Sequence, residues 1–259
     1  MTPALPFAGK RIWVTGGAGY LGTPVTAALD SAGADVLCFD LAGRAEQLVR
    51  ERQLTRTTGI TFDCSDATRL PDLVDATIAQ HGLPDGLAHL TFASSAGKSL
   101  EQLAPEEFQK TFDLALTPTF VLCRSLAERM KFRGSGSIVL FSSMYGVVAP
   151  DPRIYNEPLT PNPIDYGASK AAILQLARYF AVHYGPAGVR FNCVTPGAFP
   201  NPAVQQAQPA FIASLARKSA LNRIGQNSEI VGPTLFLLGD GASYVTGHSL
   251  VVDGGWTAW

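Results

Sequence analysis

The sequence has few of the residues that bind metals or form disulfides. Its 259 residues include only four cysteines and four histidines. It has no C-x-x-C motif and no Cys/His pair at metal-ligand spacing, so we expect neither a metal site nor a redox dithiol. Cys38 and Cys193 lie inside apolar runs, which predicts small buried side chains. A reducing compartment fits this usage of cysteine.

Charge is scarce as well: charged residues make up 16% of the chain, and the net charge is −1. The densest basic stretch, RMKFR at 129–133, is short, so we expect no nucleic-acid partner. No apolar run approaches the roughly 20 residues that cross a bilayer, and the N-terminus lacks the pattern of a signal peptide. These absences predict a cytoplasmic protein without a membrane partner.

Apolar residues are plentiful, at 46%. They form short runs that alternate along the chain with longer segments of helical period. Short apolar runs predict strands at 11–15, 35–39, 60–63, 86–92, 137–142, 189–194 and 248–252. Segments of helical period predict helices near 20–32, 43–53, 67–80, 105–131, 165–184 and 227–238. Strands that are apolar throughout are typical of a parallel sheet covered on both faces. We therefore predict one α/β domain over residues 1–259, with a doubly wound parallel sheet of about seven strands.

Proline gathers in two stretches, 149–164 with five prolines and 196–209 with four. Because proline blocks helices and central strands, both stretches are predicted to be loops. Both follow strands, so they should lie at the carboxyl edge of the sheet, where open α/β folds bind ligands. We expect 149–164 and 196–220 to be loops that form the substrate pocket. Three glutamines of the second segment are polar candidates, although a solvated helix face explains them equally well: Gln205, Gln206 and Gln208.

Glycines cluster where the first strand gives way to the first helix, in VTGGAGYLG. Gly16 allows a tight turn, Gly19 allows the backbone to approach a pyrophosphate, and Gly22 allows the helix to pack against the sheet. The N-terminus of the helix presents free N–H groups to phosphates. The pattern predicts a dinucleotide-binding turn, and the alternative is an ordinary glycine-rich turn.

Two carboxylates are predicted to end neighbouring strands. Asp40 can accept both ribose hydroxyls of an adenosine and would repel a 2′-phosphate, which favours NAD over NADP. Arg44 lies four residues on and could soften that preference. Asp63 could accept the adenine amino group, and a helix cap formed with Asp66 is an alternative of similar weight.

The sequence DYGASK places Tyr166 and Lys170 one helical turn apart. An ammonium beside a phenol, together with a cationic nicotinamide ring, lowers the phenol pKa and makes it a general acid/base near neutral pH. Ser142 and Ser143 end the fifth predicted strand, and we favour Ser143 as the hydroxyl that donates to a substrate oxygen. Pro196 and Gly197 are expected to turn the chain against the nicotinamide, and the alternative is a plain turn.

Together these motifs resemble the short-chain dehydrogenase/reductase family along essentially the whole chain, down to the ending VVDGGW. The resemblance implies a Rossmann-type fold and NAD(P)-dependent interconversion of alcohols and carbonyls. It implies that Ser143 polarises the carbonyl, Tyr166 transfers the proton and Lys170 lowers the tyrosine pKa. It also implies a homodimer or homotetramer formed through the helices near 105–131 and 165–184. The cofactor residues are expected to be Gly16, Ala18, Gly19, Tyr20, Leu21, Asp40, Asp63, Cys64, Thr91, Phe92, Tyr166, Lys170, Pro196, Gly197 and Phe199.

Three features resemble the extended members of that family more than the short ones. The glycine spacing is T-G-x-x-G-x-x-G, and AHLTFASS stands where short members carry N-N-A-G. Ser143 and Tyr166 are 23 positions apart, more than in short members. The chain nevertheless ends like a short member, and we interpret it as an intermediate form.

A fourth departure affects the proton relay. Short members carry an asparagine in the helix after the fourth strand, and Ala115 stands at that position. Pro118 lacks an N–H and would free the carbonyl of Leu114. We hypothesise that this carbonyl, alone or with Thr117, holds the relay water instead.

The function predicted from the sequence is an oxidoreductase that uses NAD, or NADP, to interconvert a secondary alcohol and a ketone. The mixed motifs favour a sugar-derived or polyhydroxylated small-molecule substrate. Two alternatives stay open. One is an epimerase or dehydratase that keeps its NAD, and the other is a non-catalytic NAD-binding regulatory protein.

Overall fold

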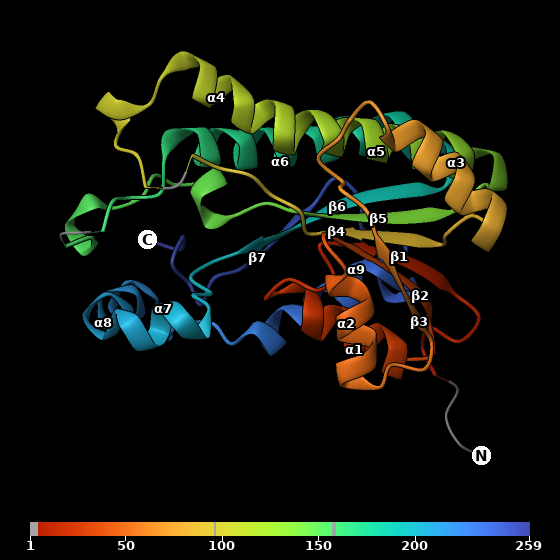
Figure 1. The fold of residues 1–259 in the computed structure, drawn as a ribbon, viewed down its shortest axis with the longest axis horizontal. Coiled ribbons are helices and arrows are strands. Elements are labelled where there is room, and N and C mark those ends of the chain that lie inside the picture. Colours follow the sequence, from red (N-terminus) through yellow and green to blue (C-terminus); the bar gives the residue numbers. More distant parts are fainter. Residues whose placement is uncertain (1–4, 96, 157–158) are drawn as a thin grey trace.

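A computed structural model describes residues 5–95, 97–156 and 159–259. One parallel sheet lies between two layers of helices (Figure 1). Its strands are β1 (Arg11–Thr15), β2 (Asp35–Asp40), β3 (Thr57–Thr61), β4 (Gly86–His89), β5 (Gly136–Phe141), β6 (Val189–Pro196) and β7 (Ser249–Val252). Their order across the sheet is β3-β2-β1-β4-β5-β6-β7. The predicted fold class, a doubly wound parallel sheet of the Rossmann type, is confirmed.

The α-helices are α1 (Gly22–Ser31), α2 (Arg44–Arg52), α3 (Leu70–His81), α4 (Pro105–Thr111), α5 (Thr117–Arg133), α6 (Ile164–Tyr184), α7 (Pro202–Ala207), α8 (Pro209–Lys218) and α9 (Val231–Leu238). Helices α3, α5 and α6 cover one face of the sheet, and α1, α2 and α9 cover the other (Figure 1). Helices α7 and α8 lie apart from both layers, beyond the end of β6.

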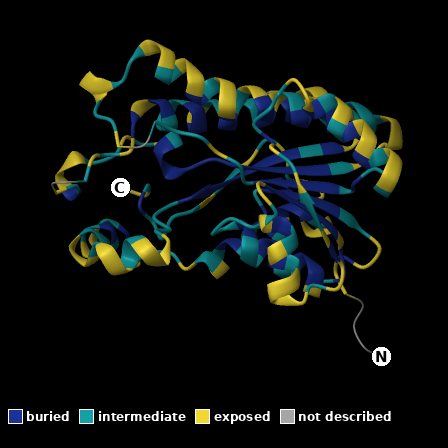
Figure 2. Cartoon of the chain, viewed as in Figure 1, coloured by how far each residue is buried: buried dark blue, intermediate teal, exposed yellow. Residues whose placement is uncertain are grey.

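Both faces of the central strands are buried (Figure 2). Trp13 and Phe39 pack in the core formed with α3, α5 and α6, whereas Val14 and Val36 pack in the core formed with α1 and α9. Successive side chains of a strand point to opposite faces, so a strand that is covered on both faces favours apolar residues at most positions. This explains why the strands read as continuous apolar runs.

Two strand boundaries differ from the prediction by three residues, and the others differ by at most two. β3 begins at Thr57 rather than at residue 60, because its first residues pair with β2 and the Thr57 hydroxyl donates to Asp30 at 2.8 Å. β4 ends at His89 rather than at residue 92, because its pairing with β1 ends where Thr15 gives way to the glycine turn. The apolar runs in the sequence do not show where β3 begins or where β4 ends.

The prediction of a continuous loop over 196–220 is wrong, because α7 and α8 occupy most of it. Pro202 and Pro209 stand at the first position of each helix, where a missing N–H costs nothing. Asn201 caps α7 by accepting from the N–H of Val204 at 3.0 Å. The other predicted loop, 149–164, has a 3₁₀ turn at Pro152–Ile154, and its residues 157 and 158 lie outside the described residues.

The single helix predicted near 105–131 is three pieces in the structure. A π-helical turn, Phe112–Leu116, joins α4 to α5. Within it the N–H of Thr117 donates to the carbonyl of Phe112, a step of five residues. Pro118 follows at once and supplies no N–H, so the change of helical pattern coincides with the missing donor.

All four cysteines are buried and unpaired, which confirms the interpretation of Cys38 and Cys193. Within the ranges that the structure describes, the helices are all too short or too polar to cross a membrane.

Candidate active site

The glycine turn lies at the carboxyl edge of the sheet, between β1 and α1. Gly16 has φ +68°, a backbone conformation that favours glycine, and its N–H donates to the carbonyl of Phe39 at 2.8 Å. A Cβ on Gly22 would lie 2.1 Å from the carbonyl oxygen of Gly16, which leaves no room for a side chain. This close approach brings the start of α1 against the turn, as a phosphate-binding backbone requires.

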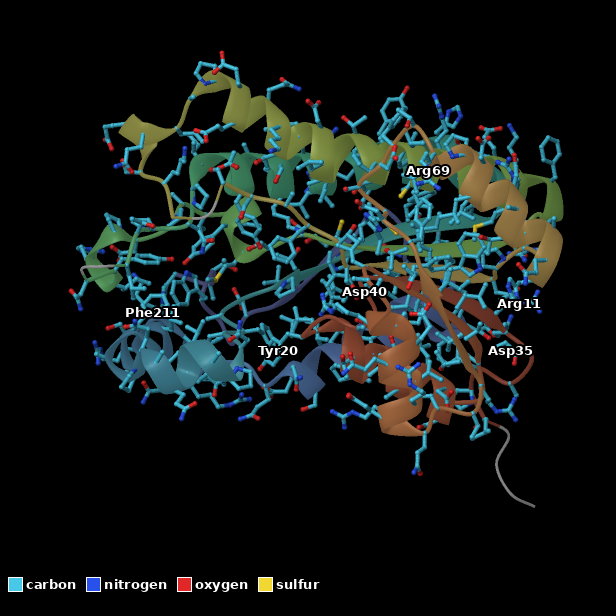
Figure 3. All side chains as sticks on the ribbon, viewed as in Figure 1. Arg11, Tyr20, Asp35, Asp40, Arg69 and Phe211 are labelled. Carbon is cyan, nitrogen blue, oxygen red and sulfur yellow. The ribbon has the colours of Figure 1, made fainter. Side chains whose placement is uncertain are left out.

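Asp40 supports the same turn from the end of β2. Its carboxylate accepts from the N–H of Ala18 at 2.9 Å and from the N–H of Leu41 at 2.8 Å. Arg44 pairs with Asp40 at 3.4 Å and donates to the carbonyl of Ala18 at 3.0 Å. The carboxylate is buried, while the guanidinium is half exposed above it. Tyr20 and Asp40 lie toward this edge, whereas Arg11 and Asp35, at the starts of β1 and β2, lie at the opposite end (Figure 3).

Two adjoining hollows follow the edge. The first extends from Asp40 to the segment after β4, and it is lined by Gly16, Gly19, Phe39, Asp40, Leu41, Arg44, Phe62, Asp63, Cys64, Ser65, Leu90, Thr91, Phe92, Ala93 and Leu114. The second is lined by Gly16, Gly19, Tyr20, Leu21, Gly22, Leu90, Phe92, Phe141, Ser142, Ser143, Tyr166, Lys170, Pro196, Gly197, Phe199 and Asn201. They share Gly16, Gly19, Leu90 and Phe92. Every residue predicted for catalysis or cofactor binding lines one of the two, except Ala18, whose N–H bonds Asp40 instead.

Asp63 lines the first hollow and also closes a local turn. Its Oδ1 accepts from the N–H of Ser65 at 2.8 Å and from the Ser65 hydroxyl at 2.7 Å. Asp66 forms a similar turn with the Thr68 hydroxyl at 2.7 Å. The carboxylate of Asp63 therefore serves the local turn while facing the space where an adenine was expected.

Tyr166 and Lys170 face the second hollow from the first two turns of α6. The ammonium of Lys170 lies 5.8 Å from the centroid of the Tyr166 ring and 5.9 Å from that of Phe92. It donates to the carbonyl of Phe141, at the end of β5, at 2.8 Å. That bond anchors the lysine to the sheet beside the phenol.

Burial shifts the pKa values of both groups. It lowers the pKa of Lys170 to about 8. It raises the pKa of Tyr166, and a hydrogen bond with Ser143 acts in the opposite direction. The spacing of Tyr166 and Lys170 predicts that the pKa of Tyr166 is lowered when a nicotinamide cation is present. In the free chain the pKa of Tyr166 is raised instead, because burial of the phenol outweighs the lowering effect of Ser143.

The two candidate serines differ in what they bind. The Ser142 hydroxyl donates to the carbonyl of Lys170 at 2.7 Å, so it fixes α6 to the end of β5. Ser143 lines the same hollow as Tyr166 and acts to lower the pKa of that phenol, and the Ser143 Oγ accepts from the N–H of Tyr145 at 3.2 Å. That leaves the Ser143 hydroxyl as the donor beside the phenol.

A buried polar network that was not predicted from the sequence lies near the carboxyl edge of the sheet. His89 is 2% exposed and bonds Thr15 through Nδ1 at 2.6 Å and Thr119 through Nε2 at 2.8 Å. The Thr119 hydroxyl donates to the carbonyl of Ala115 at 2.6 Å, so Nε2 must carry the proton that Thr119 accepts. Thr91, a predicted cofactor residue, lies 3.0 Å from the same nitrogen. The only signal in the sequence was the histidine at the end of an apolar run.

Residues 149–156 and helix α8 meet in a cluster that includes Tyr166, which lines the second hollow. Lys218 of α8 pairs with Asp151 at 3.0 Å, and the ring centroids of Phe211 and Tyr155 are 5.1 Å apart. The Tyr155 hydroxyl bonds that of Tyr145 at 2.7 Å. Asn201 lines the hollow, whereas the three glutamine candidates do not: Gln205, Gln206 and Gln208.

The residues fit a dinucleotide better than a metal. The turn closed by Gly16 and Gly22 leaves backbone, rather than side chains, facing the space between the two hollows. The described residues include no group of three or more His, Cys, Asp or Glu side chains that could hold a metal ion.

Comparison with known proteins agrees with this geometry. A family model described as enoyl-(acyl carrier protein) reductase matches residues 18–257. The chain is 31% identical over 254 residues to 2,5-dichloro-2,5-cyclohexadiene-1,4-diol dehydrogenase of Sphingobium indicum, covering 96% of this chain and 98% of the relative. It is 31% identical over 258 residues to cyclopentanol dehydrogenase of Comamonas testosteroni, covering 96% and 97%.

A solved short-chain dehydrogenase from Leptospira borgpetersenii with bound NAD⁺ superimposes with a TM-score of 0.86 at 31% identity, covering 97% of this chain and 94% of that one. The chain therefore belongs to the short-chain dehydrogenase/reductase family. Structural neighbours in this family bind NAD or NADP.

Proposed function

We propose that the protein is an NAD(P)-dependent oxidoreductase that interconverts a secondary alcohol and a ketone. The observation that carries the proposal is that Ser143, Tyr166 and Lys170 face the same hollow as the glycine turn. The relatives, named as dehydrogenases of cyclic alcohols and diols, support the same class of reaction.

The dinucleotide would be held by the glycine turn and would supply the hydride acceptor or donor. Ser143 donates a hydrogen bond to the substrate oxygen, which stabilises the charge that develops there. Tyr166 exchanges the proton of that oxygen. Lys170, anchored on the carbonyl of Phe141, places a positive charge beside the phenol and favours its ionised form.

We propose a neutral cyclic or polyhydroxylated alcohol as the substrate. Half of the side chains that line the second hollow are apolar, among them Leu21, Phe92 and Phe199. Lys170 is the one charged side chain among its lining residues, and it is engaged beside Tyr166. Asn201 offers a polar contact for a second hydroxyl.

The test follows NADH absorbance with NAD⁺ and a panel of cyclopentanol, cyclohexane-1,2-diol, sorbitol and gluconate. We expect turnover with at least one neutral alcohol, and a loss of about 100-fold or more in kcat for Tyr166→Phe. Tyr179→Phe, an exposed tyrosine on the same helix, is the matched control and should keep full activity. Full turnover by Tyr166→Phe would show that the proton passes elsewhere.

We also propose that NAD is preferred over NADP, because the buried carboxylate of Asp40 would repel a 2′-phosphate. Asp40→Ser should raise the ratio of kcat/KM for NADP to that for NAD by about tenfold or more, since it removes a like charge and leaves Arg44 free to pair with phosphate. Asp63→Ser, a second carboxylate of the same hollow, is the control. An unchanged ratio would contradict the assignment.

Two other functions remain as outcomes of the same measurements. A sugar epimerase or dehydratase would purify with bound dinucleotide and form no net NADH, and a regulatory protein would bind NADH without any turnover. A cytoplasmic location and assembly as a homodimer or homotetramer stay predictions.

A further inference from the structure

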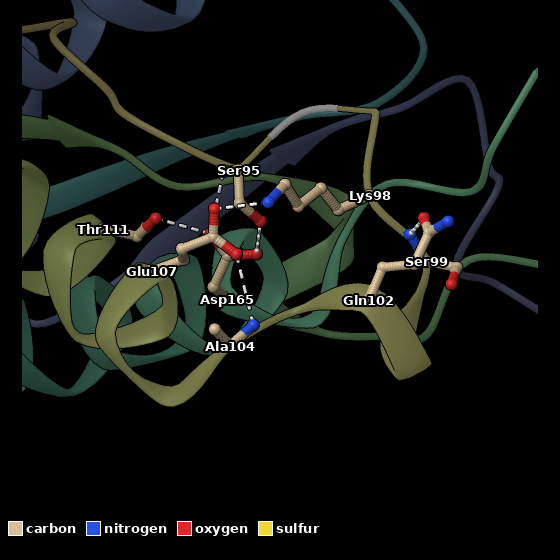
Figure 4. Close-up of polar contacts among 8 residues, drawn as sticks. All are labelled: Ser95, Lys98, Ser99, Gln102, Ala104, Glu107, Thr111 and Asp165. Atoms are coloured by element: carbon tan, nitrogen blue, oxygen red, sulfur yellow. Dashed lines mark hydrogen bonds and ion pairs between the residues drawn. The ribbon is translucent and has the colours of Figure 1, made fainter.

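A fully buried carboxylate stands immediately before the catalytic tyrosine and takes no part in the proposed reaction. Asp165 lies in the first turn of α6 and is 0% exposed. Its Oδ2 accepts from the N–H of Ser95 at 2.9 Å and from the Thr111 hydroxyl at 2.5 Å. Its Oδ1 accepts from the Ser95 hydroxyl at 2.8 Å (Figure 4). Three donors therefore converge on one side chain.

Hydrogen bonds and the helix N-terminus compensate this buried charge. Burial by itself raises the pKa of Asp165, but the bonds from Thr111 and Ser95 outweigh it and hold the pKa below its usual value. Asp165 also lies at the N-terminal end of α6, where the helix dipole favours a negative charge. The carboxylate is therefore a stable acceptor at neutral pH.

The three donors belong to two residues, Ser95 and Thr111, which are both far from Asp165 in the sequence. Ser95 lies on the segment that follows β4, four residues after Thr91 and three after Phe92. Thr111 is the last residue of α4. Asp165 thus ties the segment that begins with Thr91 and Phe92, and the end of α4, to the turn that carries Tyr166 (Figure 4).

The same segment has a second attachment further on. Lys98 pairs with Glu107 of α4, and Glu107 also accepts from the N–H of Ala104 at 3.2 Å. At its other end, the Phe92 ring meets the Tyr166 ring edge-on, with centroids 6.2 Å apart. The attachment at Asp165 lies between these two, so it is the one nearest to the wall formed by Phe92.

We propose that Asp165 is a positioning residue for the reaction. Its carboxylate holds the segment 91–95, and with it the wall formed by Thr91 and Phe92, at a fixed place relative to Tyr166. Loss of this tie allows the wall and the phenol to shift independently, so fewer bound substrates reach a reactive geometry. The inference rests on the proposed function of Tyr166 as the group that exchanges the proton.

The principal test compares Asp165→Ala with Asp30→Ala. Asp30 is also a buried carboxylate that accepts from a backbone N–H and a hydroxyl, those of Arg56 and Thr57, but it lies at the opposite end of the sheet. The probe is the neutral alcohol of the panel above that reacts fastest. We expect Asp165→Ala to lower kcat about tenfold or more, with a larger primary deuterium isotope effect, because the chemical step slows. We expect Asp30→Ala to lower only the melting temperature.

A conservative variant separates the tie from the charge. In Asp165→Asn the amide oxygen can still accept from Ser95 N–H and Thr111, and the amide NH₂ can donate to the Ser95 hydroxyl, which turns to accept. We therefore expect Asp165→Asn to keep kcat within about threefold of the wild type. If Asp165→Ala does not fold, the pair Ser95→Ala with Thr111→Val removes the two hydroxyls while keeping the carboxylate, and it should reproduce the loss in kcat.

A measurement without turnover keeps the inference distinct from the proposed function. Amide hydrogen exchange over residues 90–99, read by mass spectrometry, should be faster in Asp165→Ala and unchanged in Asp30→Ala. A wild type that forms no NADH with any alcohol contradicts the proposed function, while the exchange result still decides whether the tie exists. A folded Asp165→Ala, or the folded double variant, with wild-type kcat, isotope effect and exchange overturns the positioning role.

Discussion

Burial favours the neutral form of three side chains near the carboxyl edge of the sheet. It raises the pKa of Tyr166, lowers that of Lys170 to about 8, and lowers that of His89 to about 3. In each case the neutral form is favoured over the charged one. Burial therefore disfavours the charged form of each group, although a pKa of about 8 leaves Lys170 largely protonated at pH 7.

His89 makes a prediction for stability against pH. Burial lowers its pKa in the folded state, with a further contribution from Lys170, and the unfolded value is the ordinary 6.5. Between these values the unfolded chain binds the extra proton, so stability falls as pH drops from about 6.5 toward about 3. The slope from this group is at most about 1.4 kcal/mol per pH unit.

Urea unfolding at pH 7, 5.5 and 4.5 measures this slope. His89→Asn removes the titrating group and should flatten the curve, whereas His183→Asn, on α6, serves as the control. An identical slope in wild type and His89→Asn would show that another group governs acid unfolding.

Gly22 makes a prediction for packing. A methyl group there meets the carbonyl of Gly16, so Gly22→Ala should cost about 1–3 kcal/mol in unfolding free energy and abolish NADH binding. Gly232→Ala, inside α9 with no atom within 4 Å of the added Cβ, should be neutral or slightly stabilising. Fluorescence titration with NADH and urea unfolding give both quantities, and tight NADH binding by folded Gly22→Ala would contradict the geometry.

At the scale of elements, α8 and the segment 149–155 pack in one cluster with Tyr166, and we expect their contact to form one side of the substrate pocket. Phe211 supplies the aromatic part of that contact through Tyr155, and Lys218 supplies an ion pair with Asp151. A partly exposed ion pair contributes little, so the aromatic contact should dominate.

Phe211→Ala therefore tests how far α8 orders the pocket. We expect the KM for the alcohol to rise about three- to tenfold, because the aromatic pair contributes about 0.5–1.5 kcal/mol, with a small change in kcat. Phe132→Ala, at an exposed position near the end of α5, is the control. An unchanged KM would show that α8 does not order the pocket.

The helix that joins β4 to β5 shows what sequence patterning could not provide. The pattern predicts one helix over 105–131, and Pro118 marks a local weakness in it, but not its form. The π-helical turn at Phe112–Leu116 depends on which carbonyl each N–H selects, and Thr119 further engages the carbonyl of Ala115. The hypothesis of a relay water on Leu114 or Thr117 stays a prediction.

At the scale of the whole molecule, apolar side chains remain exposed on the outer face of α5 and α6. Tyr179 is 67% exposed and Val182 is 80% exposed, while Phe120 of α5 stacks on Phe180 with centroids 6.0 Å apart. Exposed apolar side chains that cluster on one face are typical of an interface.

This face makes a prediction for assembly. Light scattering during gel filtration should give a homodimer or homotetramer for the wild type and a smaller species for the double variant Tyr179→Glu with Val182→Glu. Tyr244→Glu, another fully exposed aromatic position, is the control. A monomeric wild type would contradict the predicted assembly.

Much of the architecture was predictable because it depends on patterns that repeat. Runs such as Ile12–Val14 are apolar on both faces, and only a doubly covered parallel sheet buries them. Gly16 directly follows β1, and Tyr166 and Lys170 lie in the first two turns of α6, so the topology of the sheet brings these two distant segments together. Asp165, His89 and the helices at Pro202 and Pro209 could not be predicted in the same way, because their roles depend on partners that only the folded chain supplies.

The double engagement of Asp40 has a consequence for redesign. The carboxylate that would discriminate between cofactors also braces the loop around Ala18 and restrains Arg44. A mutation of Asp40 that weakens the preference between cofactors therefore also removes contacts that hold the loop around Ala18 in place. Directed evolution toward the phosphorylated dinucleotide should accumulate compensating changes around position 18 before, or together with, replacement of the acid itself.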